Sequence, residues 1–209
     1  MAARGLIEYY GLGHWWHEEL IPEQRARLES VFHIFGNSNP RPLTEGPIER
    51  IVGPTATPAG FLADLISLLP SGPQDSELRR KIRLKLAKLA QSETDVVARH
   101  FSLHVLIGQY YRDRNGDPGC RDAAIAACRE QIALAPRTAV AIRPLFRAAL
   151  PGHLGFQQLA IILEKDGRFE EAIALCRCAL EGGWYGDWER RIARCERRYA
   201  KANLRRQSA

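Results

Sequence analysis

The stretch GFQQLAIILEKDGRFEEAIALCRCALEGGW, residues 155–184, limits the possible folds of this chain more than any other feature. In its first half, apolar and small residues recur at the spacing of one helix face: Phe156, Leu159, Ala160 and Leu163. Gly167 then permits a turn, and the pattern resumes with Phe169, Ala172, Cys176 and Ala179. Two helices approach closely only where small residues replace bulky ones. The alternation therefore predicts two helices packed tightly against each other.

A weaker version of this design precedes it at residues 101–136, FSLHVLIGQYYRDRNGDPGCRDAAIAACREQIALAP. An aromatic-rich helix is followed by the turn formers DRNGDPG and by a second helix, predicted over Arg121–Ala135 and stopped by Pro136. Because this turn is long, we expect a degenerate unit. Residues 137–150 predict one further helix, bent or broken near Pro144.

Residues 187–206, DWERRIARCERRYAKANLRR, predict a helix that is apolar along one narrow stripe and charged elsewhere. Asp187 is a favourable N-cap residue, and the stripe consists of Ile192, Cys195 and Tyr199. Arrays of helical repeats need a polar-faced helix to cover the terminal repeat. We expect residues 187–206 to form such a capping helix.

The helix pair at residues 153–184 resembles the tetratricopeptide repeat, a helix–turn–helix unit of 34 residues. The likeness covers about 30 of the 209 residues, and Trp184 stands where that repeat usually ends with proline, so we expect a non-standard exit. The resemblance implies an all-α, right-handed array of helix–turn–helix repeats over residues 59–209. The whole arrangement is similar to small bacterial repeat proteins that open with a Gly-Leu…Trp-Trp segment, a group from which no activity carries over.

The region just before the repeats is also helical in pattern. Residues 61–70 (FLADLISLLP) predict a short apolar helix stopped by proline, and Thr94–Arg112 predicts a longer one. Between them lies SELRRKIRLKLAKLA, whose apolar face carries Leu78, Ile82, Leu86 and Leu89 and whose other face is basic. No stretch alternates convincingly with period two, so we expect no sheet.

Residues 1–58 have a different character. Two proline-rich runs, GNSNPRPLTEGP and IVGPTATPAG, indicate a connector of about 20 residues. Ahead of it, a helix is predicted from Pro22, because proline suits a first turn and apolar residues then recur at helical spacing. We expect an irregular N-terminal segment with one or two helices, packed on the helical body.

Within that segment, GLGHWWHEEL (residues 11–20) admits three interpretations. On a helix, His14 shares a face with His17 and Glu18, a spacing that can bring ligands to one divalent ion. Alternatively, Trp15 and Trp16 form an aromatic ligand surface. In the third interpretation, which we favour, at least one indole is buried and anchors the segment, because burying a tryptophan stabilises by several kcal/mol.

The net charge of +6 is unevenly spread. Residues 187–206 hold eight Lys/Arg and three Asp/Glu, and residues 77–88 hold six Lys/Arg and one Glu, so each stretch carries +5. The predicted helices at 77–90 and 187–206 could therefore bind nucleic acid or another acidic partner. For nucleic acid, the cations to test are Arg190, Arg194 and Arg197.

Several classes of protein are disfavoured. No apolar run is long enough to span a membrane, no secretory leader is visible, and the five cysteines form no CxxC pair. We expect a cytoplasmic protein with reduced thiols and no membrane partner. No Ser-His-Asp order, P-loop or dinucleotide fingerprint occurs, so enzymatic activity is the less favoured interpretation.

Tetratricopeptide-like arrays present a groove lined by their first helices, where a peptide or another protein usually binds. Carried over from the resemblance, the groove positions are Gln157, Ile161, Glu164 and Lys165. Trp184 and Trp188, four apart around a helix start, either pack in the core, which we favour, or form an aromatic wall for the partner. Arg143 and Arg147 on the preceding helix add positive charge, which suits an acidic segment or a terminal carboxylate. We expect a protein-interaction module without a cofactor. The alternatives are nucleic-acid binding through the basic helices and a metal-dependent activity at HWWHE.

Overall fold

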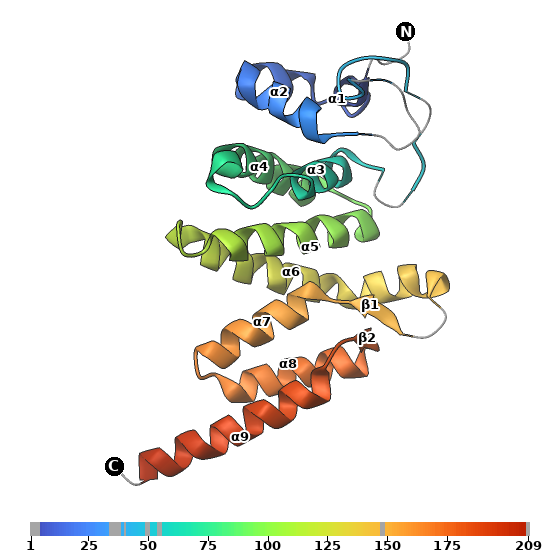
Figure 1. The fold of residues 1–209 in the computed structure, drawn as a ribbon. Coiled ribbons are helices and arrows are strands. Elements are labelled where there is room, and N and C mark those ends of the chain that lie inside the picture. The colour runs from blue at the N-terminus through green and yellow to red at the C-terminus, as the bar shows by residue number, and fades with distance from the viewer. Residues whose placement is uncertain are drawn as a thin grey trace. The chain divides into compact units, whose positions relative to one another are not determined.

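The computed structural model describes residues 5–33, 39, 41–48, 51–53, 56–146 and 149–207, without the side chains of residues 205–207. The chain forms two compact units, Met1–Val105 and Leu106–Ala209, and the division falls within helix α5 (Val96–Asp113). Packed helices make up nearly all the regular structure of each unit (Figure 1). The all-α class predicted from helical periodicity is confirmed.

The first unit begins with helix α1 (Gly5–Tyr9), the π-helical turn η1 (Trp15–Glu19) and helix α2 (Pro22–Val31). The first N–H groups of α1 have no partners within the helix, and carbonyls of a turn at residues 42–46 accept from them at 2.9–3.1 Å. Gly5 is required there, because its φ is +79° and a Cβ would lie 2.5 Å from the carbonyl oxygen of Leu43. This turn ties the start of the chain to the segment after α2.

The same unit continues with helix α3 (Pro58–Ser67), the 3₁₀ turn η2 (Pro73–Asp75) and helix α4 (Ser76–Ser92). Thr57 begins α3 as its N-cap, since its hydroxyl accepts from the backbone N–H of Gly60 at 3.1 Å. Helices α3 and α4 pack together through apolar faces. The predicted stripe of α4 is buried at Leu78, Ile82 and Leu86.

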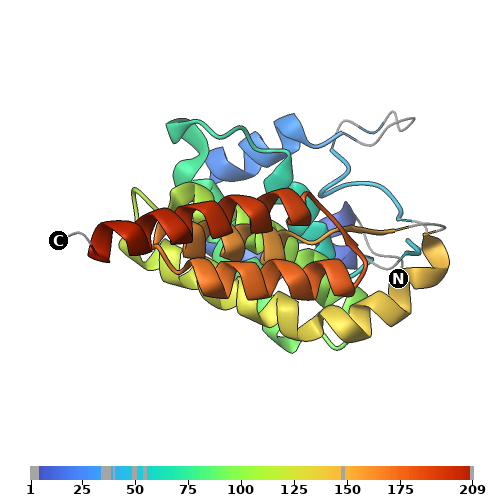
Figure 2. The same cartoon turned by 90° about the horizontal axis from the view of Figure 1, so that it is seen from below.

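The second unit contains helix α6 (Pro118–Ile142), the 3₁₀ turn η3 (Arg143–Leu145), strand β1 (Leu150–Gly152), helices α7 (Leu154–Lys165) and α8 (Phe169–Glu181), strand β2 (Trp184–Tyr185) and helix α9 (Trp188–Gln207). Helix α7 packs on α6 and α8, and α8 packs on α9 (Figures 1 and 2).

The turn between α7 and α8 forms as the sequence predicts. Gly167 has a φ of +74°, the left-handed conformation that glycine adopts without strain. The N–H of Arg168 donates to the carbonyl of Leu163 at 2.9 Å, and the N–H of Gly167 donates to that of Glu164 at 3.3 Å. This pair of bonds is a Schellman motif, which ends α7 and turns the chain back.

Two local predictions are wrong. Helix α6 does not stop at Pro136 but continues to Ile142, so residues 137–142 belong to it and not to a separate helix; the predicted break near Pro144 does occur, at the turn η3. Buried Ala135, Thr138 and Ile142 continue one packed face past the proline, and that burial offsets the lost hydrogen bond. A small parallel sheet also forms, in which Leu150 of β1 pairs with Trp184 of β2. It is too short for a period-two pattern to reveal it.

No helix in the described part of the chain has both the length and the apolar character needed to cross a membrane.

Candidate partner-binding site

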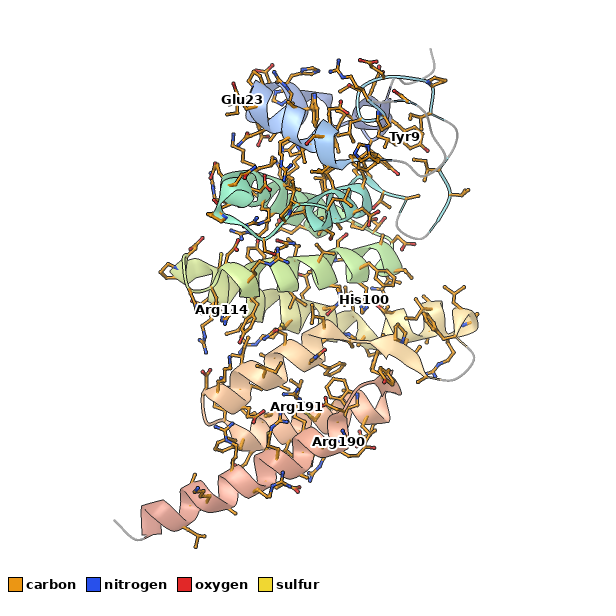
Figure 3. All side chains as sticks on the ribbon, in the orientation of Figure 1. Tyr9, Glu23, His100, Arg114, Arg190 and Arg191 are labelled. Atoms are coloured by element: carbon orange, nitrogen blue, oxygen red, sulfur yellow. The ribbon has the colours of Figure 1, made fainter. Side chains whose placement is uncertain are left out.

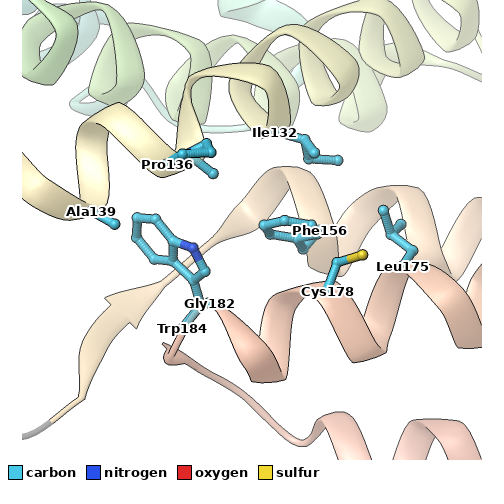
Figure 4. A pocket seen from close by; sticks show the side chains of 9 residues that line it. Ile132, Pro136, Ala139, Phe156, Leu175, Cys178, Gly182 and Trp184 are labelled. Atoms are coloured by element: carbon cyan, nitrogen blue, oxygen red, sulfur yellow. The ribbon is translucent and has the colours of Figure 1, made fainter.

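An apolar pocket of about 370 Å³ lies in the second unit between α6 and α8 (Figure 4). Helix α6 contributes one wall, helix α8 the other, and the rings of Phe156 and Trp184 lie between them. The lining residues are Ile132, Ala135, Pro136, Ala139, Phe156, Leu175, Cys178, Gly182 and Trp184. Pockets of this size and apolar character commonly hold a ligand or a side chain of a partner.

A cluster of aromatic rings fixes the floor of this pocket. The ring of His153 lies 4.6 Å, centroid to centroid, from both Phe156 and Trp184. The Nδ1 atom of His153 accepts from the backbone N–H of Phe156 at 3.3 Å, which makes His153 the N-cap of α7. The indole N–H of Trp188 donates to the carbonyl of Trp184 at 2.7 Å. These contacts hold both lining rings in place.

Pro136 gives the α6 wall an unusual feature. Proline has no backbone N–H, so the carbonyl of Ile132 lacks its regular helical donor. Ile132 and Pro136 both line the pocket, on the helix wall that faces Trp184 and Phe156 (Figure 4). This acceptor therefore belongs to a residue of the pocket wall.

Arg143 does not line the pocket, but it lies against Gly183, which stands between two lining residues. The guanidinium nitrogens of Arg143 are 3.5 and 3.7 Å from the position that a Cβ would take on Gly183. The two neighbours of Gly183, Gly182 and Trp184, line the pocket. The structure thus brings together Arg143 and Trp184, two of the predicted partner-binding residues.

The elements around the pocket also expose apolar side chains. Val140 on α6, Leu145 on η3 and Tyr185 on β2 are each at least 70% exposed, and Phe146 and Leu180 are exposed as well. Several exposed apolar groups carried by neighbouring elements are typical of an interaction surface.

The predicted groove positions on α7 do not join this pocket. Gln157 and Lys165 are exposed and Ile161 is half-buried. The structure places Glu164 differently from the prediction, because its side chain is 9% exposed and its carboxylate is bound by arginines of α9. Glu164 is therefore unavailable to a partner.

Trp188, also predicted to bind a partner, supports the pocket without lining it. Trp188 is only 2% exposed, its indole N–H donates to the carbonyl of Trp184, and its ring lies edge-on to Phe156 with the centroids 6.4 Å apart. Arg147, the last of the predicted partner residues, lies outside the described residues.

The basic helix α9 uses three of its arginines, Arg191, Arg194 and Arg198, to bind Glu164. Arg194 donates two hydrogen bonds of 2.8 Å to Glu164, and Arg191, labelled with Arg190 in Figure 3, is buried beside the same carboxylate. Arg190 and Arg197 are exposed, and neither forms an ion pair with any side chain that the structure describes. Of the three cations proposed for nucleic acid, two remain available.

Part of the basic face predicted for α4 is internal to the first unit, since Arg79 and Arg83 are buried, whereas Arg80 and Lys88 are exposed. Arg79 is 4% exposed and donates to the carbonyls of Pro70 and Gly72, which follow α3. Lys81 donates to the carbonyl of Glu19 at 2.6 Å and to the side chain of Gln24 at 3.1 Å. Because Arg79 and Lys81 donate to backbone carbonyls of neighbouring turns, fewer positive charges are available to a partner than the net charge of residues 77–90 indicates.

In the first unit, both indoles of HWWHE are buried: Trp15 is 1% and Trp16 is 3% exposed. The prediction that at least one of them is buried is confirmed. Trp15 therefore presents no surface to a ligand, whereas Trp16 also lines a polar pocket of about 410 Å³. Arg25 caps the π-helical turn, since its guanidinium donates to the carbonyls of Trp16, His17 and Leu20 at 3.0–3.3 Å.

The proposed metal ligands His14, His17 and Glu18 are all exposed. They lie around a π-helical turn, whose i→i+5 bonding differs from the α-helical spacing assumed for them. Among the residues that the structure describes, no group of three or more His, Cys, Asp or Glu side chains is arranged to hold a metal ion. The geometry gives the metal interpretation no support.

The thiol of Cys178 lines the pocket, and the other four of the five free cysteines are buried, so its reaction with a thiol reagent can be used to monitor the pocket. Burial raises the pKa of Cys128 to about 12 and that of Cys176 to about 11, which disfavours their reactive thiolates at neutral pH. We expect a thiol reagent to modify one of the five thiols rapidly in the native protein, and Cys178→Ser to remove that fast phase. Fast modification of two or more thiols before unfolding would contradict this assignment.

A comparison of the chain with protein-family models, curated proteins and solved structures found no match in any of the three.

Proposed function

We propose that the second unit is a protein-interaction module whose apolar pocket between α6 and α8 receives a bulky side chain of a partner peptide. The observation that carries the proposal is the pocket itself, about 370 Å³ in volume and floored by Phe156 and Trp184. The aromatic cluster supports it further, since rings held in place lose little freedom when a ligand binds. We further propose that α7, α8 and α9 are a tetratricopeptide-like repeat with its capping helix.

The occupant we propose is a peptide segment with a large apolar side chain beside a carboxylate. The apolar lining suits the side chain, and Arg143, which lies against Gly183 beside the lining residues Gly182 and Trp184, suits a carboxylate that extends past the pocket. The carbonyl of Ile132 would accept from a donor on the same peptide. Five free thiols fit a reducing compartment, so we place this module in the cytoplasm.

Selection from a random peptide library with the full chain tests this proposal. We expect the selected peptides to share a bulky apolar residue next to Asp or Glu. Ala139→Arg puts a charged side chain into the pocket and should weaken binding about tenfold or more. The reason is that the peptide can then no longer bury its bulky apolar residue there, and such burial contributes roughly 1.5–3 kcal/mol. Arg143→Gln should weaken only the acidic peptides.

The matched control is Ala133→Arg, the same substitution at an exposed position of α6 that does not line the pocket. It should leave binding unchanged. A bound peptide should also protect Cys178 from thiol reagents, since that side chain lines the pocket. Equal binding by the Ala139→Arg and Ala133→Arg variants, or selection of peptides with no shared apolar residue, would refute the proposal.

A further inference from the structure

A second, polar pocket of about 170 Å³ occurs elsewhere in the second unit, where α5 ends and α6 begins, against the end of α7. Its lining residues are Tyr111, Arg114, Asn115, Arg121, Ile162, Lys165 and Asp166. It shares no residue with the apolar pocket, so a ligand of the polar pocket would bind whether or not the apolar pocket holds a peptide.

Two cations gather on one aromatic ring in this pocket. The guanidinium carbon of Arg114 lies 3.9 Å from the ring centroid of Tyr111, and the ammonium of Lys165 lies 5.7 Å from it. Lys165 also donates to the hydroxyl oxygen of Tyr111 at 3.1 Å. The ring holds both positive charges in position, although they repel each other.

The charges of the pocket do not balance. Asp166 is the acidic side chain of the lining, and both of its oxygens accept from Arg121 at 2.6–2.7 Å. Neither Arg114 nor Lys165 forms an ion pair with any residue in the described part of the chain. Three cations and one carboxylate leave a formal charge of +2.

The pocket also has more free hydrogen-bond donors than free acceptors. The hydroxyl of Tyr111 accepts from Lys165, which leaves its own hydrogen to donate. Lys165 keeps further N–H groups, and Arg114 uses one nitrogen on the carbonyl of Tyr111 and keeps the others. A hydroxyl, an ammonium and a guanidinium thus present donors to a space whose carboxylate is already bound.

We propose that this pocket binds a phosphate group, either as the free ion or as a phosphate monoester on a larger molecule. A phosphate carries about −1.5 to −2 charge at neutral pH and has three strong acceptor oxygens. That charge matches the +2 of the lining, and the oxygens match the three donor groups. A ligand with a single carboxylate would neutralise only half of the +2 charge of the lining.

Nuclear magnetic resonance titration of the full chain with inorganic phosphate tests this site, at constant ionic strength. We expect saturable shifts confined to amides near Tyr111, Arg121 and Lys165. Lys165→Met and Arg114→Met should each weaken binding about tenfold, the value of one charge-assisted hydrogen bond. Tyr111→Phe removes a donor without changing charge and should weaken binding by a smaller factor.

The matched control is Arg190→Met, which removes an exposed cation from α9. It should leave phosphate binding unchanged. A parallel titration with O-phosphoserine distinguishes the sources: tighter binding than inorganic phosphate indicates a phosphoryl group presented by a larger molecule, and weaker binding indicates the free ion. Absence of saturable shifts with both probes, or equal losses in Arg190→Met and Lys165→Met, would overturn the proposal.

Discussion

Replacing Trp15 with alanine is expected to lower the free energy of unfolding of the first unit by about 3–5 kcal/mol. Trp15 is 1% exposed and is among the largest fully buried side chains. Truncating it leaves a cavity among the other buried apolar residues of this segment, such as Leu12, Trp16 and Leu28, and these can collapse only partly into that space. Hydrogen exchange of the amides in α1, α2 and α4 measures the loss within this unit.

The neighbouring residue provides the control for this substitution. His14 is exposed, so His14→Ala should change stability by no more than about 0.5 kcal/mol. Limited proteolysis should cut the Trp15→Ala variant faster within residues 5–33 and leave the His14→Ala variant unchanged. If the two variants unfold alike, the indole does not anchor the N-terminal segment.

The helices could be predicted from the sequence where all features of the neighbouring residues indicate the same beginning and end of a helix. In α7 and α8, apolar spacing, small residues and Gly167 all indicate the same helix–turn–helix, and the structure has it. Burial of Trp15 followed from an energetic argument, because an ordered N-terminal segment must bury large apolar groups to offset its loss of conformational entropy. The structure buries more such groups than that argument assumed, among them Leu12, Leu28 and Leu43. Each of these inferences needed only neighbouring residues.

Where a local sequence pattern and burial against distant segments favour different structures, the prediction from the local pattern was wrong. Pro136 is a helix breaker in isolation, yet α6 continues through it because Ala135, Thr138 and Ile142 are buried. Likewise, helical spacing predicts a solvated face for the arginines of α4, whereas Arg79 is buried because it caps carbonyls that follow α3. Burial against distant segments decided both outcomes.

The candidate sites were harder to predict than the helices. The apolar pocket unites Pro136 with Trp184, which are far apart in the sequence, and it lies on α6 and α8, away from the predicted first-helix groove. Trp184 was predicted as a partner-binding residue and does line the pocket, but nothing in the sequence indicated that α6 would form the facing wall. The phosphate pocket depends on Tyr111 meeting Lys165, and nothing in the spacing of these residues indicates that contact.

The environment of Glu164 also depends on residues that are distant in the sequence. Its position one step from the core predicts a place in the groove. In the structure, hydrogen bonds from Arg194 and Arg198, opposed by burial, lower the pKa of this carboxyl from 4.5 to about 2. Arg191, 7% exposed in its side chain, also lies 3.5 Å from the same carboxylate.

Glu164→Gln is expected to lower the free energy of unfolding at neutral pH by about 3 kcal/mol, because it leaves a buried arginine and two half-exposed ones without their counter-charge. Glutamine keeps the shape of the side chain, so the loss reports charge rather than packing. Denaturant unfolding of the second unit, followed by the fluorescence of its tryptophans, measures it.

The pH dependence identifies the carboxylate as the cause. A carboxyl whose pKa is lower in the folded state stabilises fully above its unfolded value of 4.5, and this contribution disappears as the pH falls through about 2. The stability difference between wild type and Glu164→Gln should therefore be constant above about pH 5 and shrink toward pH 2. Glu171→Gln is the control: Glu171 also pairs with an arginine, Arg168, but at an exposed site, so its loss should have little effect. A difference that stayed constant down to pH 2, or an equal loss in Glu171→Gln, would show that the charge of Glu164 is not what stabilises the second unit.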